Sequence, residues 1–270
     1  MSGRADGATP LVWTPELVKK FWEWESAQAG TLWFTAQVPD ALHRLIVAAM
    51  PPRAALLDVG CGEGFMGARL MAGGFSYTAA DISEERLARV ATLLSSRPGW
   101  RGTARLGADG AIPVADASQD GVILFETLEH LLDDQLDREI AELRRVLRPG
   151  GRLLITVPNA EDIPSKTVFC PVCAHSFHRV QHQRSYTSAS LSAFLEARGF
   201  ATWFAAAGDL VALQSRPLRN PLRWSAFYLA RRAALGLARV TAGITGDPRR
   251  WLRTALPGQG DNLVWCGTRT

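Results

Sequence analysis

The segment that most limits the fold of this chain is a short apolar run that opens into a glycine-rich loop. Residues 54–59 read Ala-Ala-Leu-Leu-Asp-Val, and Gly60-Cys-Gly-Glu-Gly64 follows at once. Positive φ angles are cheap only for glycine, and a turn without Cβ atoms lets a ligand approach the backbone. A buried strand that passes through such a turn into a helix is the first half of a βαβ unit, which binds ligands at the carboxyl ends of its strands.

The rest of the chain continues this alternation of short apolar runs and amphipathic stretches, which is typical of βαβ units around a parallel sheet. The expected strands are 54–59, 76–81, 102–107, 120–125, 151–157, 200–206 and 262–268, and the expected helices are 15–28, 39–50, 133–147 and 187–199. A chain of 270 residues with 47% hydrophobic content can bury one full core. The sequence therefore predicts an α/β fold.

The domain organisation follows from the segments that do not fit this alternation. We expect a helical cap over 1–50 and a main domain over 51–270, with two inserts in the main domain. The first insert, 158–186, carries a cysteine pair and three histidines, and the second, 208–261, is rich in arginine. The first ten residues are small and polar, so we expect them to be loosely held.

The positive charge of the chain gathers in the second insert. The formal net charge is +4, and between Arg216 and Arg253 nine arginines accompany one acid, Asp247. Residues 222–240 fit an amphipathic helix with an arginine face, which favours either peripheral contact with an anionic membrane or a lid helix packed on its own domain. Its aromatic residues follow no RNA-binding pattern, so we expect no nucleic-acid partner. Without a long apolar run or a secretory leader, the expected location is the cytoplasm.

A second acid suggests what the glycine loop binds. Asp81 ends the next expected strand, about twenty residues beyond the loop, where a carboxylate can accept hydrogen bonds from both ribose hydroxyls of a nucleoside. Gly62-x-Gly64-x-x-Gly67 also matches the dinucleotide pattern, so an NAD-dependent oxidoreductase remains an alternative. Acids at Asp58 and Glu63 favour the ammonium and sulfonium groups of S-adenosylmethionine over a diphosphate.

Five segments between residue 54 and about residue 158 resemble, in the right order, the motifs of class I S-adenosylmethionine-dependent methyltransferases, especially the ubiquinone-biosynthesis branch. They are Leu56 to Gly64, Ala80 to Ser83, Ile112 to Ile123, Glu126 to Leu131 and Leu147 to Pro158. The resemblance implies a Rossmann-like sheet of seven strands whose last strand is antiparallel. It also implies S-adenosylmethionine as the cofactor.

The resemblance further implies a role for particular residues in cofactor binding. Asp58 would hold the amino group, Asp81 the ribose hydroxyls, and the acid before Ile112, which is Asp109, the adenine amino group. The remaining cofactor residues implied are Gly60, Cys61, Gly62, Gly64, Ile82, Gly110 and Glu126. Asp109 stands three residues before Ile112, whereas the family places its acid four before. The backbone of Ala108 or Gly110 is therefore an alternative partner for adenine, and Asp109 is then a solvated turn acid.

The first insert contains a pattern of metal-ligand type. Cys170, Cys173, His178 and His182 follow the spacing C-x2-C-x4-H-x3-H, whose half-spacings occur in structural zinc sites. The cysteines can equally be free thiols or a pair that oxidises. His182 has a second interpretation as the base that deprotonates an acceptor hydroxyl, and His130 either borders the methyl-donor pocket or packs and caps.

These observations favour an enzyme that transfers a methyl group to an oxygen, rather than to nitrogen or carbon, of a small metabolite or a lipid- or sugar-linked intermediate. We expect aromatic rings of the N-terminal cap at the acceptor pocket, and core packing for Phe21 and Trp24. The alternative class is a non-catalytic module that binds the cofactor and contacts a partner. The sequence does not identify the acceptor or predict an oligomeric state.

Overall fold

The computed structural model describes residues 8–27, 33–107, 109–214, 233–234, 237 and 247–270. The amphipathic helix expected over 222–240 lies almost wholly outside these residues, so its membrane contact stays a prediction. Within the described parts of the chain, no helix is both long enough and apolar enough to span a membrane.

The main body is built on a seven-stranded sheet with the order β4-β3-β2-β5-β6-β10-β9. The strands are β2 (Ala55–Val59), β3 (Ser76–Asp81), β4 (Trp100–Arg105), β5 (Gln119–Phe125), β6 (Leu147–Pro158), β9 (Phe200–Gly208) and β10 (Asn262–Arg269). Strand β10 is antiparallel to both β6 and β9, and the other neighbours are parallel. The expected Rossmann-like sheet with an antiparallel last strand is confirmed.

Helices cover both faces of this sheet. One face packs against α3 (Pro39–Ala49), α4 (Gly67–Ala72), α5 (Glu84–Leu94) and α10 (Arg249–Ala255), and the other against α6 (Asp133–Val146) and α7 (Ser188–Glu196). Alternation along β2 shows how the sequence serves both cores, because Leu56 joins the first and Leu57 the second. Short elements α2 (Phe34–Gln37), α8 (Leu210–Leu213), η1 (Leu128–His130) and η2 (Pro164–Lys166) connect these layers.

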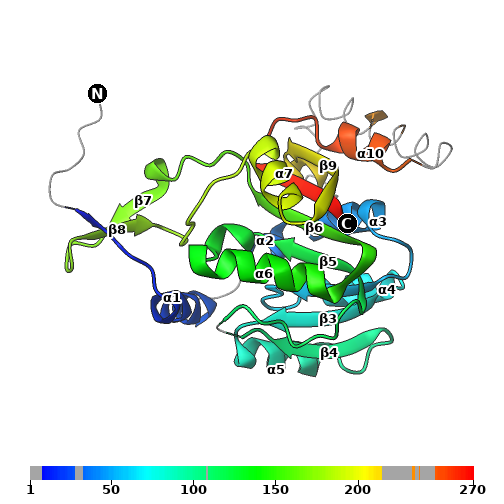
Figure 1. Cartoon of the computed structure of the whole chain (residues 1–270), viewed down its shortest axis with the longest axis horizontal. Helices are drawn as coiled ribbons and strands as arrows, with labels where there is room; N and C mark the ends of the chain where they lie inside the picture. Colours follow the sequence, from blue (N-terminus) through cyan, green and yellow to red (C-terminus); the bar gives the residue numbers. More distant parts are fainter. Residues whose placement is uncertain (1–7, 28–32, 108, 215–232, 235–236, 238–246) are drawn as a thin grey trace, which may run out of the picture.

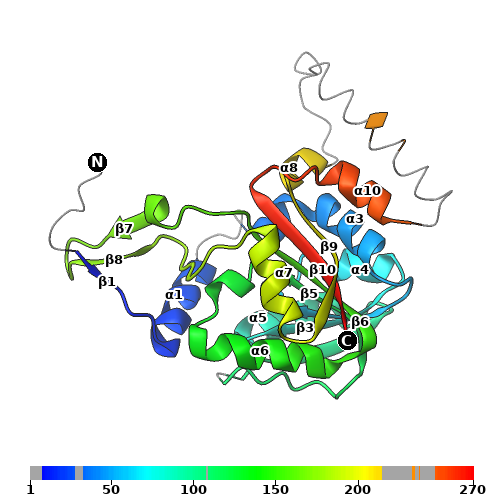
Figure 2. The same cartoon turned by 45° about the horizontal axis from the view of Figure 1, so that its top comes forward.

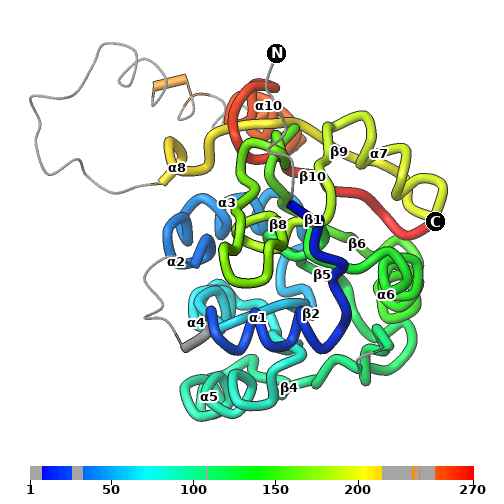
Figure 3. The backbone as a smooth tube through the Cα atoms, turned by 90° about the vertical axis from the view of Figure 1, so that its left-hand side faces the viewer, coloured from blue at the N-terminus to red at the C-terminus, as the bar shows by residue number. Residues whose placement is uncertain are grey.

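A second, three-stranded sheet lies outside the main body and was not expected from the sequence. It has the order β1-β8-β7, where β1 is Thr9–Pro10, β7 is Thr167–Phe169 and β8 is His175–His178. Figures 1 and 2 show it at one end of the long axis of the molecule, and Figure 3 looks at this end. The insert 158–186 is thus partly a hairpin, and the loose N-terminus expected over the first ten residues is wrong for Thr9 and Pro10.

Helix α1 (Pro15–Ala27) connects this small sheet to the main body. Trp13, just before the helix, contacts Phe21 and Phe177 edge to face, with ring centroids 5.5 and 5.9 Å apart. The core packing expected for Trp24 is wrong, because its side chain is 60% exposed. The helix packs through Phe21, as expected, and through Trp22, whose ring contacts both Phe21 and His130.

Candidate functional site

The glycine loop makes a tight turn at the carboxyl end of β2, as the sequence predicted. Gly60, Gly62 and Gly64 have φ values of +73°, +54° and +68°, a region that other residues rarely adopt. A Cβ atom at Gly60 would lie 2.6 Å from the hydroxyl oxygen of Thr127, whereas one at Gly62 would meet no atom within 4 Å. Gly60 is therefore required for packing, and Gly62 presents bare backbone to open space.

Asp81 joins this loop to the end of β3. Its carboxylate accepts hydrogen bonds from the backbone N–H of Gly62 at 3.0 Å and of Ser83 at 2.9 Å, and a guanidinium nitrogen of Arg86 lies 4.0 Å away. Asp81 is only 4% exposed, and burial raises the pKa of its carboxyl group. The two elements that the sequence assigned to a nucleoside site are thus in direct contact.

Asp58 lies deeper, at the end of β2. One of its carboxylate oxygens accepts a hydrogen bond of 2.7 Å from the Tyr77 hydroxyl. Burial raises the pKa of Asp58 to about 7, against a smaller lowering by the Tyr77 hydrogen bond and a further raising by Asp81. A buried carboxylate without a cationic partner is costly, and the positive charge of a bound ammonium group would remove that cost.

Glu63 does not occupy the role that the sequence argument gave it. Its carboxylate binds the guanidinium of Arg89 at 2.9 Å and lies 3.9 Å from that of Arg86. Two arginines therefore compensate its charge, so it does not oppose an anionic ligand. The electrostatic preference for a cationic ligand rests on Asp58.

The loop expected at adenine has its acid turned to the solvent. Asp109 is exposed, and its carboxylate accepts a hydrogen bond from the backbone N–H of Ala111 at 3.2 Å, as a turn acid does. Gly110 is buried with a φ of +85°, and the apolar side chain of Ile82 is 45% exposed beside Asp81. The geometry thus favours backbone groups of this loop and Ile82, rather than the Asp109 carboxylate, as the surroundings of an adenine ring.

Two residues of interest, Glu126 and Thr127, directly follow the end of β5. Thr127 is the residue against which Gly60 packs. Glu126 has a φ of +49°, and one of its carboxylate oxygens, Oε1, is buried without a hydrogen-bond partner among the described residues. Burial raises the pKa of Glu126 to about 7. A positive φ at a residue other than glycine and a buried carboxylate oxygen without a hydrogen-bond partner are both features that cluster at functional sites.

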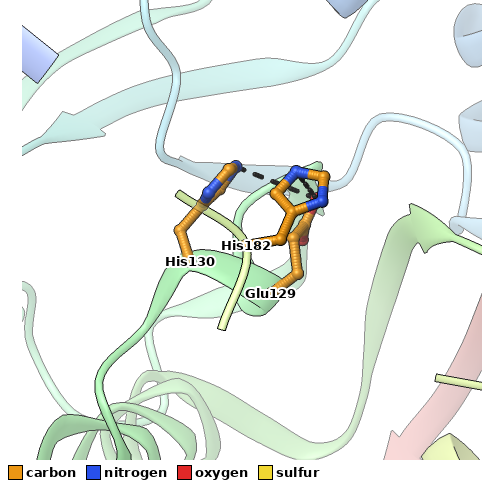
Figure 4. A group of neighbouring side chains, drawn as sticks. All are labelled: Glu129, His130 and His182. Atoms are coloured by element: carbon orange, nitrogen blue, oxygen red, sulfur yellow. Dashed lines mark ion pairs between the residues drawn. The ribbon is translucent and has the colours of Figure 1, made fainter. Parts of the chain in front are cut away.

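Immediately beyond, Glu129, His130 and His182 form a compact group (Figure 4). The Nε2 atoms of both histidines lie 3.9 Å from Oε1 of Glu129. Glu129 is 1% exposed, and neither carboxylate oxygen has a hydrogen-bond partner in the described part of the chain. Burial raises the pKa of Glu129 well above its usual range and lowers that of His130 to about 3, so this imidazole is neutral. The structure thus brings together the two histidines that the sequence named as catalytic candidates.

Glu161 fixes the orientation of His182 from behind. Its carboxylate is hydrogen-bonded to Nδ1 of His182, binds Lys166 at 2.7 Å, and lies 3.6 Å from Nε2 of His178. A proton held on Nδ1 by a carboxylate leaves the lone pair of Nε2 free toward Glu129, which is the arrangement found behind metal-bound histidines. His178 is less available as a ligand, since its Nδ1 accepts the backbone N–H of His182 at 3.1 Å.

The N-terminal cap closes this group from the other side. The ring of Trp22 contacts that of His130 edge to face at 4.8 Å, and its indole N–H donates to Gln181 at 3.0 Å. The side-chain N–H of Gln181 in turn donates to the backbone carbonyl of His130 at 2.9 Å. Arg86 reaches the carbonyl of Trp22 at 3.4 Å and lies over the ring of Trp33 at 4.8 Å. Aromatic rings of the cap therefore border this group, and their place at an acceptor pocket stays a prediction.

The four residues of the C-x2-C-x4-H-x3-H pattern do not form one group in this structure. Cys170 and Cys173 lie in the turn of the hairpin, whereas His178 pairs with Thr167 at its opposite end. Three residues of extended chain separate His175 from His178, which is about 10 Å. Among the described residues, the groups able to hold a metal ion include His178 or His182 but neither cysteine.

The sequence reasoning missed four residues of the site, Glu129, Glu161, Lys166 and Gln181. Glu161 carried a signal, because it follows the end of β6 at the edge of the sheet where ligands bind. Gln181 carried none, since its side chain meets Trp22 only through a contact 159 positions apart in the chain.

Comparison with known proteins places this geometry in a family. The model of a methyltransferase domain matches residues 33–203. A probable S-adenosylmethionine-dependent methyltransferase of Mycolicibacterium smegmatis is 32% identical over 58% of this chain and 57% of its own length. A ubiquinone biosynthesis O-methyltransferase of Xanthomonas axonopodis is 28% identical over 77% of this chain and 85% of its own. The chain spans about half the length, or less, of several of the relatives that it matches.

Solved structures show the same fold at low identity. A Burkholderia thailandensis N-methyltransferase, 1,6-didemethyltoxoflavin-N1-methyltransferase with bound S-adenosylhomocysteine, is similar with a TM-score of 0.57 and 17% identity. That alignment covers all of this chain and 98% of the other. A methyltransferase of Haloferax volcanii, in complex with its activator Trm112, gives a TM-score of 0.58 at 15% identity, with coverage of 93% and 97%.

Proposed function

Because the chain belongs to the methyltransferase-domain family and has the class I fold, we propose that it transfers the methyl group of S-adenosylmethionine to a hydroxyl oxygen of a small-molecule acceptor. We assign the cofactor to the loop between Asp58 and Gly64 with Asp81 at its ribose. Asp58 supplies the negative charge for the ammonium group, and the bare backbone at Gly62 allows close approach.

The observation that carries the choice of a hydroxyl acceptor is the unpartnered carboxylate of Glu129 between two imidazoles, adjoining the residues that pack on the glycine loop. Methyl transfer needs alignment and, for a hydroxyl, a means of removing its proton. We propose that Glu129, His130 and His182 hold a divalent ion such as zinc, which binds the acceptor oxygen and lowers its pKa.

Geometry and charge support this assignment. In a tetrahedral zinc site the ligand atoms lie about 3.4 Å apart, given metal–ligand distances near 2.1 Å. The two Nε2 to Oε1 separations of 3.9 Å therefore need to close by only about half an ångström. Two imidazoles and one carboxylate suit zinc and leave a fourth position for the acceptor.

The test uses the full chain, labelled S-adenosylmethionine and a panel of phenols, catechols, aliphatic alcohols and amines. We expect methyl transfer to a hydroxyl compound in the presence of zinc or manganese, lost on chelation and restored by the metal. Glu129→Gln should abolish transfer while leaving S-adenosylhomocysteine binding within about threefold. Glu84→Gln, which changes an exposed ion pair with Arg105, is the matched control.

Two results would contradict the proposal. Transfer to amines alone, unaffected by chelation or by Glu129→Gln, would contradict both the metal ion and the hydroxyl acceptor. Calorimetric binding of NAD without binding of S-adenosylhomocysteine would contradict the proposed methyltransferase activity.

A further inference from the structure

The turn between β7 and β8 holds two cysteines in a fixed conformation, and we name residues 168–174 the hairpin tip. The backbone N–H of Cys170 donates to the carbonyl of His175 at 2.8 Å, and that of Ala174 donates to the carbonyl of Cys170 at 2.9 Å. Ala174 has a φ of +56°, which turns the chain back into β8. Both thiols are free, with Cys170 half-buried and Cys173 exposed.

Cys170 and Cys173 are separated by two residues on this turn, which is the spacing of cysteine pairs in structural zinc sites. The backbone N–H groups of Cys173 and Val172, and the thiol of Cys173, hold the pKa of Cys170 below its usual range. Two sulfurs on one short turn supply two neighbouring ligands of a tetrahedral shell.

In the described part of the chain, no third metal-ligand atom lies beside this pair. Cys61 and Cys266 are buried in the main core, and His178 lies at the far end of the hairpin. Among the residues that the structure describes, no metal-capable group of three includes Cys170 or Cys173. The remaining residues of the sequence contain no cysteine or histidine and a single acid, Asp6. A structural zinc shell needs four ligands, so two must come from another chain.

The surface of the hairpin tip fits a second copy of itself. Val168, Phe169 and Val172 are 40%, 54% and 93% exposed, although each is apolar. No residue from 167 to 174 carries a charge, so two identical tips meet without electrostatic repulsion. The tip lies at the end of the long axis, away from the main sheet (Figures 1 and 2), where a second chain can reach it. A two-fold axis at this point places the same residues on both sides.

We propose that the hairpin tips of two copies of this chain share one zinc ion, with Cys170 and Cys173 of each copy forming a four-thiolate shell. The apolar side chains around the cysteines then pack across the two-fold axis. This dimer does not depend on the proposed methyl transfer, and its metal is distinct from the ion assigned to Glu129, His130 and His182.

The test uses the full chain, reduced and without a metal-affinity tag, in the Glu129→Gln background so that zinc at the other site is not counted. We expect half an equivalent of zinc per chain, and a dimer in sedimentation velocity that a chelator converts to monomer. Cobalt should give a sulfur-to-metal charge-transfer band. Cys170→Ser with Cys173→Ser should lose the zinc, the band and the dimer together.

Two further variants separate this arrangement from its competitors. His175→Ala should keep the band and the dimer, because the shell contains sulfur alone. Val172→Asp keeps all four thiols but places like charges on both tips, and it should weaken dimerisation at least tenfold. A full equivalent of thiolate-bound metal on a monomer, equal zinc uptake by the double cysteine variant, or a dimer unaffected by Val172→Asp would each overturn the shared site.

Discussion

The raised pKa of Asp58 predicts that cofactor binding depends on pH in a range where an ordinary aspartate does not titrate. Asp58 has a pKa of about 7 in the free protein, and its usual value is 3.8. An ammonium group binds the carboxylate and not the neutral acid. The fraction of chains able to bind therefore falls as pH falls through 7, and the apparent Kd rises in proportion.

The size of the effect follows from this value. At pH 8 about nine-tenths of Asp58 is ionised and at pH 5 about one-hundredth, so Kd should increase about 100-fold, or roughly 2.7 kcal/mol. An aspartate with its usual pKa would change Kd by about a tenth or less over the same range. Binding near pH 7 should also release about half a proton, because the bound ammonium restores the charged form.

Isothermal titration calorimetry with S-adenosylhomocysteine between pH 5 and 8 measures both quantities, the proton release through buffers of different ionisation enthalpy. The groups that face Asp58 are the Tyr77 hydroxyl, Asp81 and the thiol of Cys61. Tyr77→Phe removes the hydrogen bond that lowers the pKa of Asp58, so the inflection should move to higher pH. Asp58→Asn should bind more weakly and without this pH dependence. A Kd that is flat from pH 5 to 8, or a dependence that survives in Asp58→Asn, would refute the reasoning.

Three further predictions concern the loop, the site and the core. Gly60→Ala should lower the free energy of unfolding by about 2 kcal/mol, because its Cβ would meet Thr127 at 2.6 Å and the residue has a positive φ. Gly62→Ala should lower the free energy of unfolding by about 1 kcal/mol and chiefly weaken cofactor binding. Urea unfolding measures the effect on stability, and calorimetry measures the effect on binding. Glu161→Gln should weaken zinc binding at the Glu129 site about 10- to 100-fold with cofactor affinity unchanged, and equal zinc affinity would contradict its orienting role. Leu143→Ala should cost about 2–5 kcal/mol of stability by leaving a cavity under α6, without altering the cofactor Kd of the folded protein.

The cofactor half of the site could be predicted from the sequence because each of its parts is local. The glycine loop follows β2 directly, and Asp81 ends the next strand, so a parallel pairing of the two strands is enough to bring them together. For Asp109, the sequence indicated a turn acid only as an alternative. Its carboxylate accepts a hydrogen bond from the backbone N–H two residues later, and the length of the loop does not predict this bond.

The four residues of the zinc pattern lie apart in this structure because the insert is not one compact loop, which is what a count of ligand spacing assumes. Four intervening residues between Cys173 and His178 can fold into a knuckle, but here most of them form a strand of a hairpin. The two ends of an extended strand lie far apart. The alternation of polar and apolar residues that would have predicted this strand is only four residues long. The inference that Glu63 favours a cationic ligand failed for a related reason. Its partners Arg86 and Arg89 lie on α5, more than twenty residues away in the sequence.

The proposed acceptor half of the site is assembled from segments far apart in the sequence, unlike the cofactor half. The motifs shared with the family therefore indicate the cofactor half and not the acceptor half. Trp22 comes from α1, Glu129 and His130 come from η1, and Glu161 and His182 come from the first insert. The N-terminal segment also pairs with that insert through β1 and β8. Neither segment can complete the group alone, because the two histidine rings meet only when the insert is folded against η1 and the cap covers them. We therefore expect the segments outside the βαβ core to set the choice of acceptor, so exchange of the insert between relatives should change the acceptor while leaving the cofactor Kd unchanged.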